Sequence, residues 1–277
     1  MRFAKGHGTG NDFVVIPDPD GDLELSDAAV AAMCNRHTGI GADGVLRVVL
    51  TAAVDDYASL SDDARWFMDY RNADGSAVET CGNGIRVFAR YLLAAGYTDG
   101  DVVRIATRDG IKHVIVNNAG FTVDMGTPKA DPADPVTVGV NGADYSVTCV
   151  SVGNPHAVIV VDDPSRAPLE RVGESLQQHE LFPGGVNVEL VTVRAPDAVA
   201  MRVWERGVGE TQSCGSGACA AVVATSLRGA TGRAATVAVP GGELHVEWRA
   251  DDRILLTGPA EIVAEGAFDD GWLAAHA

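Results

Sequence analysis

Two cysteines stand in the same local pattern, and thiol chemistry is the strongest functional signal in the sequence. Cys81 begins Cys-Gly-Asn-Gly and Cys214 begins Cys-Gly-Ser-Gly. Each motif follows an apolar, strand-like run and a polar loop, and each precedes an apolar stretch, 85–95 or 218–227, that predicts a helix. A cysteine at a helix N-terminus lies at the positive end of the helix dipole, which favours thiolate over thiol. Each sulfur is therefore a candidate base or nucleophile.

The glycines of the two motifs predict an anion site beside each thiol. Without a Cβ atom they allow a ligand to approach backbone N–H groups that have no partner within the helix. One such motif would be a weak signal, because structural cysteines are commoner than catalytic ones. Two copies at equivalent points of two half-chains are a much stronger one.

Two thiols and two anion-binding helix starts suit the inversion of a carbon stereocentre by proton exchange. That reaction needs a base on one face of the carbon, an acid on the other, and a grip on the substrate carboxylate as negative charge develops. Each sulfur must approach the carbon to roughly 3–3.5 Å. The two sulfurs would then lie about twice that distance apart, so we expect that oxidation can link Cys81 to Cys214 and that the linked form is inactive.

The elements that must position these groups fall into two similar halves. A segment with three prolines, 126–135, predicts a linker between an N-terminal half, 1–130, which carries Cys81, and a C-terminal half, 131–277, which carries Cys214 and whose last residues could pack against the first half. Each half combines strand-like runs with one clear helix; the runs are 12–16, 66–70, 102–106, 112–116, 157–161, 186–191, 200–204 and 244–248. We predict an α/β protein of the α+β type, with two pseudo-symmetric domains that each wrap a mainly antiparallel or mixed sheet around a central helix and face each other across a pseudo-twofold axis.

Composition excludes several classes of function. The 277 residues carry a net charge of −17, which disfavours nucleic acid and anionic membranes as partners. The N-terminal residues lack a signal-peptide pattern and no run of 18 apolar residues occurs, so we expect a soluble, cytoplasmic protein. The excess of acidic residues is most simply a solvated surface.

Cysteine and histidine spacing gives no support for a disulfide scaffold or a metal site. Five cysteines are scattered without a CxxC pair, and no histidines fall at HxH or HExxH spacing. We expect Cys34, Cys149 and Cys219 to be core residues. No cofactor is predicted either: none of the three lysines adjoins a glycine-rich phosphate cradle, and Gly-Ile-Gly-Ala-Asp-Gly at 39–44 lacks the preceding strand of a dinucleotide loop.

The motifs together resemble those of the diaminopimelate epimerase family. The similarity runs in order from Lys5 to Ala260, and its main segments are 5–13, 72–76, 81–86, 153–156, 184–189, 204–217 and 256–260. The resemblance implies a cofactor-independent, two-base epimerase that interconverts LL-2,6-diaminopimelate and its meso isomer, a step toward lysine and peptidoglycan. It also implies an active site in the cleft between the two domains and a homodimer.

The resemblance carries specific roles to residues of this chain. Cys81 and Cys214 are the acid/base pair, with Cys81 the proton donor and Cys214 the acceptor in one direction, and His156 and Glu205 assist catalysis. The positions that match substrate-binding residues are Asn11, Asn72, Gly82, Asn83, Asn154, Asn187, Glu205, Arg206, Gly215 and Ser216. Arg206 suits bidentate binding of the distal carboxylate. One departure is Gly44, where some members carry a substrate-contacting glutamine; any contact there must come from backbone or water.

Other functions remain open from the residues alone. A proline or hydroxyproline racemase uses a similar cysteine pair, but a substrate with one carboxylate would leave Arg206 and the extra asparagines without a distal group to bind. A non-catalytic amino-acid-binding protein would have no need for both cysteines. A cysteine hydrolase that uses one thiol with His156 would leave the second motif unexplained. Taken singly, His156 could be structural, and Glu205 with Arg206 could be an exposed ion pair.

Overall fold

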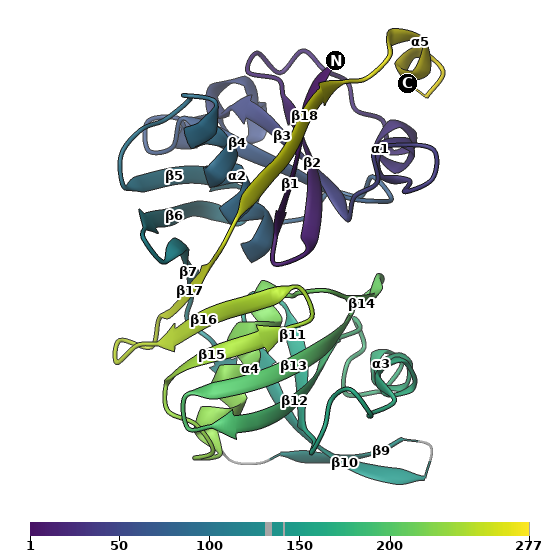
Figure 1. Ribbon diagram of the computed structural model, residues 1–277, viewed down its shortest axis with the longest axis vertical. Helices are drawn as coiled ribbons and strands as arrows, with labels where there is room; N and C mark the ends of the chain where they lie inside the picture. Colours follow the sequence, from purple (N-terminus) through teal and green to yellow (C-terminus); the bar gives the residue numbers. More distant parts are fainter. Residues whose placement is uncertain (131–134, 141, 277) are drawn as a thin grey trace. The chain divides into compact units, whose positions relative to one another are not determined.

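The computed structural model describes residues 1–130, 135–140 and 142–276, which form two compact units (Figure 1). The first unit comprises Met1–Val123 together with Pro259–Ala277, and the second comprises Asp124–Gly258. The chain thus leaves the first unit before the proline-rich segment and returns to it at Pro259. Positions 131–134 of the predicted linker lie outside the described residues.

The first unit is built from strands that alternate between antiparallel and parallel pairing. In chain order β1 to β7 pair successively as antiparallel, parallel, antiparallel, parallel, antiparallel and antiparallel neighbours. These strands are β1 (Arg2–Gly8), β2 (Asn11–Pro17), β3 (Gly44–Leu50), β4 (Trp66–Asn72), β5 (Val102–Thr107), β6 (Gly110–Asn117) and β7 (Gly120–Gly126). The returning strand β18 (Glu261–Ala267) pairs antiparallel with β1, and Figure 1 shows it in yellow beside that strand.

The second unit repeats this order of pairings. Its strands β10, β11, β12, β13, β15, β16 and β17 pair successively as antiparallel, parallel, antiparallel, parallel, antiparallel and antiparallel neighbours. Their bounds are Ala143–Ser151, Pro155–Val160, Asn187–Ala195, Ala198–Glu205, Ala234–Val239, Gly242–Trp248 and Ile254–Gly258. The short strands β8 (Lys129–Ala130) and β9 (Val136–Val140) pair with β10, and β14 (Gly209–Thr211) pairs with β13. The predicted α+β fold with a repeated domain plan is confirmed in these pairings.

One buried helix occupies the centre of each unit. Helix α2 (Gly82–Ala94) has ten buried residues, and α4 (Gly215–Leu227) is buried from Gly217 to Thr225. Small side chains make α4 apolar on all sides, which suits a helix enclosed by strands. Cys219 is fully buried in this core and Cys34 is buried in the first unit, as predicted, whereas Cys149 is only half-buried. Because each helix is enclosed, the position of its first turn is set by its surrounding strands.

Three further helices and two 3-10 turns were not predicted. They are α1 (Asp27–Cys34), α3 (Leu169–Gln177), α5 (Asp270–Ala274), η1 (Thr51–Ala53) and η2 (Asp55–Leu60). Helix α3 had a readable signal, because its buried Leu169, Val172 and Leu176 follow helical spacing. Ser26 caps the N-terminus of helix α1, because its hydroxyl accepts a hydrogen bond from the Ala29 N–H.

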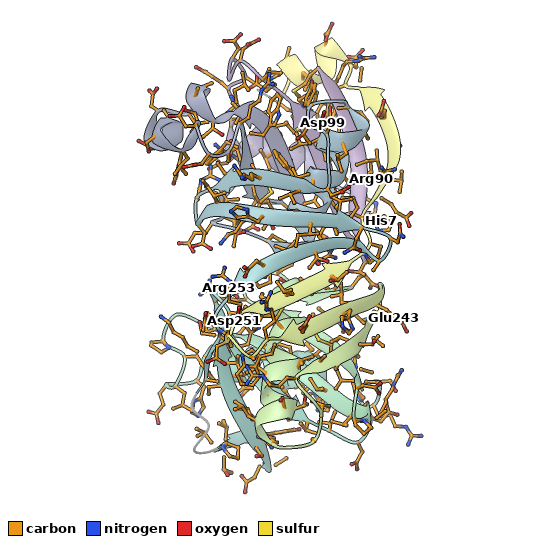
Figure 2. All side chains as sticks on the ribbon, turned by 90° about the vertical axis from the view of Figure 1, so that its left-hand side faces the viewer. His7, Arg90, Asp99, Glu243, Asp251 and Arg253 are labelled. Carbon is orange, nitrogen blue, oxygen red and sulfur yellow. The ribbon has the colours of Figure 1, made fainter. Side chains whose placement is uncertain are left out.

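Charged side chains lie mainly on the outside of both units. Five of the six residues labelled in Figure 2 are exposed charged residues of this kind: Arg90 and Asp99 in the first unit, and Glu243, Asp251 and Arg253 in the second. Among them, Arg253 pairs with Asp124 at 2.6 Å. Of the acidic residues in the described part of the chain, only Asp18, Asp69 and Glu189 are buried. The acidic excess is therefore largely a solvated surface, and Glu189 is an exception.

An ion-pair network joins β1, β2 and the segment after α1. Arg36 donates to both carboxylate oxygens of Asp12, at 3.0 and 2.8 Å, and to Asp43 at 2.8 Å. Lys5 donates to Asp12 at 2.5 Å and also to the Gly41 carbonyl. Burial raises the pKa of Asp12, but the hydrogen bonds from Arg36 and Lys5 outweigh it and lower the pKa from 3.8 to about 2.

A pH series on Asp12→Asn tests this network. A carboxyl whose pKa is lower in the folded state adds stability above its unfolded pKa and loses it as the pH falls through the folded pKa. We expect the variant to lose about 1–2 kcal/mol of unfolding free energy at pH 7, and the deficit to shrink between pH 3.8 and about 2. Urea unfolding at several pH values measures this, with exposed Asp99→Asn as the control. A deficit that stays constant down to pH 2 would contradict the network's role.

Candidate active site

The first candidate half-site lies at the start of α2. Cys81 precedes the helix with an extended backbone, and its side chain is partly exposed. Its Sγ donates a hydrogen bond to the Asn11 Oδ1 atom at 3.7 Å. Because an amide oxygen can only accept, this contact favours the protonated thiol.

The orientation of the Asn11 amide is fixed by two further contacts. Its Nδ2 donates to Asp43 at 2.7 Å, and its Oδ1 accepts from the Asn83 side chain at 3.1 Å. Asn11 begins β2, and Asp43 directly precedes its parallel neighbour β3. The structure therefore brings together Cys81, Asn11 and Asn83, which the sequence placed in one site, and adds Asp43, which the sequence analysis missed.

Other predicted residues of the first unit form hydrogen bonds with residues close to them in the sequence. Asn72, at the end of β4, donates to Ser76 at 3.1 Å and accepts from the Tyr70 hydroxyl at 3.1 Å. Gly82 begins α2, and its carbonyl accepts from the Arg86 side chain at 3.3 Å. At Gly44 a Cβ atom would lie 2.5 Å from the Arg71 carbonyl oxygen and 2.8 Å from the Tyr70 ring. In this chain a side chain at Gly44 would therefore require its neighbours to shift.

The second candidate half-site lies at the start of α4, and its cysteine is held differently. Cys214 is buried and caps the helix, because its Sγ accepts from the Gly217 N–H at 3.4 Å. Its Sγ also lies 3.5 Å from the Ser216 hydroxyl. Gly215 and Ser216 form the first turn, as the sequence motif predicted. Cys214 thus contacts hydrogen-bond donors, whereas Cys81 contacts an acceptor.

The pKa of Cys214 departs from the expectation based on the helix dipole. Burial raises the pKa of the Cys214 thiol well above its usual value, and the negative charges of Glu205 and Glu189 raise it further. The hydrogen bonds with Ser216 and Gly217 act in the opposite direction but do not compensate. Desolvation of the buried sulfur thus outweighs the lowering of the pKa that was expected from the helix start.

His156 and Asn154 form one chain of contacts with a buried carboxylate. The His156 Nδ1 atom lies 2.7 Å from Glu189 Oε1, and its Nε2 lies 2.9 Å from Asn154 Oδ1. His156 and Glu189 are both fully buried. The structure brings together the two predicted residues and adds Glu189. A signal for it existed, because Asn187 and Glu189 alternate with apolar residues in the strand-like run 186–191 and so share one face.

The remaining predicted residues of the second unit lie around the end of β13. Asn187 accepts from the Arg206 backbone N–H at 2.9 Å and donates to the Pro155 carbonyl at 3.2 Å. The Glu205 carboxylate accepts from the Thr211 hydroxyl at 2.5 Å, and the exposed Arg206 side chain donates to the Gly184 carbonyl at 3.0 Å. These contacts join Asn187 to Arg206, whereas the Glu205 carboxylate is held by Thr211.

Within the described residues no group of three His, Cys, Asp or Glu side chains is arranged to hold a metal ion. All five cysteines are free thiols. Cys149 lines an open hollow together with Lys129 and His156, and burial raises the pKa of its thiol. In the part of the chain that is described, no helix has the length and apolar character needed to cross a membrane.

Comparison of the sequence with known protein families identifies the family of this chain. The family model for diaminopimelate epimerase matches residues 3–130 and 148–263. The chain belongs to the diaminopimelate epimerase family. A diaminopimelate epimerase of Streptomyces coelicolor is 52% identical over 282 residues, covering 99% of this chain and 97% of that protein. One from Thermobifida fusca is 48% identical over 271 residues and covers 96% and 97% of the two chains.

Solved structures share the fold of this diaminopimelate epimerase family member at low sequence identity. A PhzF-family phenazine biosynthesis protein of Bacillus anthracis has a TM-score of 0.72 at 15% identity, covering 96% of this chain and 98% of its own. A hydroxyproline epimerase of Agrobacterium vitis, with bound trans-4-hydroxy-L-proline, has a TM-score of 0.70 at 16% identity, covering 100% and 98%. At such identities the likeness concerns the fold alone.

A pair of glycine variants tests the packing at the two helix starts. A Cβ on Gly217 would lie 2.6 Å from Glu189 Oε1, whereas one on Gly84 would lie 3.4 Å or more from its neighbours. We expect Gly217→Ala to cost about 1–3 kcal/mol of unfolding free energy. Gly84→Ala should be neutral or stabilising by up to about 1 kcal/mol, because alanine favours the helix. Thermal and urea unfolding measure both; equal effects would contradict this difference in packing.

A second prediction concerns the charge of Glu205. Because its carboxylate helps to raise the pKa of Cys214, Glu205→Gln should lower that pKa and increase the thiolate fraction at a given pH. A larger thiolate fraction increases the rate of alkylation by iodoacetamide in proportion, because the thiolate is the nucleophile. Mass spectrometry of the Cys214 peptide measures the rate between pH 7 and 9, with Glu210→Gln as a control. An unchanged or slower rate would show that Glu205 does not act on this thiol.

Proposed function

We propose that this protein interconverts LL-2,6-diaminopimelate and meso-2,6-diaminopimelate by moving a proton at one α-carbon, with Cys81 and Cys214 as the acid/base pair. The observation that carries the proposal is the occurrence, in a member of this family, of two helix starts that each hold a cysteine beside backbone donors. Such a reaction requires one group to remove the α-proton and another to deliver a proton from the opposite face. The product is an intermediate in the synthesis of lysine and peptidoglycan.

The first turns of α2 and α4 bind the reacting carboxylate. These turns contain Gly82 and Asn83 in α2 and Gly215 and Ser216 in α4. The backbone N–H groups of a first helical turn point away from the helix toward acceptors outside it. As the α-proton leaves, negative charge spreads onto the carboxylate, and donors already fixed in place stabilise it without reorganisation. This contribution does not depend on the net charge of the protein, because it arises from local dipoles.

The two thiols take opposite roles at the start of a turnover. Cys81 is the proton donor, since its S–H already donates to Asn11. Cys214 is the acceptor, since its sulfur accepts from the Gly217 N–H, an arrangement that also stabilises a thiolate. Its ionisation is opposed by Glu205, so a substrate ammonium group bound to that carboxylate would favour the thiolate. The roles exchange in the reverse direction.

The remaining polar residues select the second amino-acid group of the substrate. Arg206 offers a planar, always charged group for the distal carboxylate, and the side chains of Asn72, Asn154 and Asn187 can both donate and accept. His156 and Glu205 assist the proton transfer. A proline or hydroxyproline racemase would have no distal carboxylate for Arg206, so we favour the diamino acid over that alternative.

We further propose that the protein is a cytoplasmic homodimer. The family resemblance supports both statements, and the acidic composition is compatible with a dissolved protein. Light scattering on the purified protein gives the mass of the assembly directly. A monomeric mass at micromolar concentration would contradict the dimer without affecting the reaction.

Isotope exchange tests the function. Incubation with LL-diaminopimelate in deuterated water should place deuterium at one α-carbon of the product without added cofactor, because the delivered proton comes from a solvent-exchanged thiol. Mass spectrometry and chiral chromatography measure the label and the isomer. Recovery of unlabelled substrate after long incubation with reduced protein would rule out the assignment.

Cysteine variants separate the roles within this assay. Cys81→Ala and Cys214→Ala should each abolish interconversion, because each removes the acid or the base from one face. Cys34→Ala is the matched control: it also removes a thiol of the first unit, and that thiol lies in the core. Full activity of the Cys81 variant would contradict the two-base mechanism.

A further inference from the structure

The two helix starts rest on chemically different supports. In the first unit Phe13 lies two residues after Asn11 on β2, and Leu46 lies two residues after Gly44 on β3. In the second unit His156, on β11, lies two residues after Asn154. Glu189 lies two residues after Asn187 on β12, so His156 and Glu189 take the positions of Phe13 and Leu46. The register agrees, since Phe13 pairs with Gly44 and His156 pairs with Asn187.

Phe13 and Leu46 in the first unit, and Glu189 in the second, lie close to the equivalent glycine of each helix. A Cβ on Gly84 would lie 3.6 Å from the Phe13 ring and 3.4 Å from Leu46, whereas a Cβ on Gly217 would lie 2.6 Å from Glu189. The same Gly217 position lies 3.3 Å from the Cβ of Cys214. An apolar pair beneath one helix start is therefore replaced, beneath the other, by an ionisable pair next to the cysteine.

The contacts of the ionisable pair determine how many protons it holds. Asn154 Oδ1 can only accept, so the His156 Nε2 atom at 2.9 Å carries a hydrogen. The 2.7 Å contact between His156 Nδ1 and Glu189 Oε1 joins two acceptors unless one hydrogen lies between them. The pair therefore holds one shared proton, either as imidazolium and carboxylate or as imidazole and carboxylic acid, and is neutral as a whole in both forms.

The fold by itself does not require this pair. An ionisable pair that is completely buried is costly, and an apolar pair of similar volume is often at least as stable. The first unit shows that Phe13 and Leu46 fill the equivalent space, both without exposure. The second oxygen of Glu189, Oε2, is buried and has no hydrogen-bond partner among the described residues, which adds to the cost.

We propose that Glu189 is a positioning residue: by sharing one proton with His156 it fixes the imidazole and, through it, the amide of Asn154, and it keeps the support beneath Cys214 neutral. The kinetic part of this inference rests on the proposed function, whereas the shared proton does not. A negative charge on Glu189 raises the pKa of Cys214, and the proton shared with His156 compensates that charge.

Nuclear magnetic resonance of the full-length protein tests the shared proton without substrate. In protein labelled with ¹⁵N-histidine, with His156→Phe to assign the signals, we expect hydrogens on both sides of the His156 ring and a far-downfield proton in the contact with Glu189. Glu189→Gln, which preserves volume, should remove that proton and leave a neutral Nε2–H ring. A parent protein whose His156 has a bare Nε2 would overturn the inference, even if the variant did not fold.

Kinetics test the positioning role. Glu189→Gln should lower kcat for isotope exchange at least about tenfold, while KM changes less, because proton transfer is affected more than binding. Glu210→Gln, which removes an exposed carboxylate of the same unit, should keep parental values. Parental kcat together with an unchanged His156 spectrum in Glu189→Gln would refute the proposal. A parent protein without exchange activity would instead refute the proposed function, and the spectra would still decide on the shared proton.

A double variant separates function from folding. His156→Phe with Glu189→Leu reproduces the apolar pair of the first unit, so we expect a Tm no lower than that of the parent protein, together with loss of exchange. A large fall in Tm would show that the pair serves the fold, and retained exchange would show that it is not needed for positioning. Either result would contradict the inference.

Discussion

The start of a buried helix is the constraint on which both halves of this protein depend. Its first backbone N–H groups have no carbonyl partner within the helix, so something else must satisfy them. In each unit a curved sheet encloses one helix, and a Cys-Gly-x-Gly turn lies at its start. In the proposed function these N–H groups bind the substrate carboxylate, and a cysteine sulfur lies at each helix start. Strand packing thus fixes a reactive site.

The two helix starts share a backbone plan but not a chemistry. Cys81 donates to an asparagine whose amide is oriented by Asp43 and Asn83. Cys214 accepts from the helix itself and lies near Glu189 and Glu205, and its burial raises the pKa of its thiol. A reaction that takes a proton from one face and returns one to the other requires unequal groups at any instant. The difference arises from residues on the strands beneath and beside the helices.

Much of the fold could be predicted because its signals are local. Apolar runs indicated the principal strands, and the apolar stretches 85–95 and 218–227 indicated α2 and α4. Helix α1 is short and α5 is shorter still, so each offers few residues from which to recognise a period. The boundary between the units was harder to place, because the return of the chain at Pro259 depends on the pairing of β18 with β1. Such a pairing joins the two ends of the sequence and leaves no local pattern.

The sequence by itself determined which atoms could do chemistry: two cysteines at helix starts, a set of asparagines, and Glu205 with Arg206. These could be recognised because residue type and short spacing decide them. Only the tertiary structure decided the environments of these groups, including the Asp43 contact that orients Asn11 and the buried pair of His156 and Glu189. It also reversed the expected effect on Cys214. A helix dipole can be inferred from local sequence, but desolvation and the charges of β12 and β13 exist only once distant strands have packed around the sulfur.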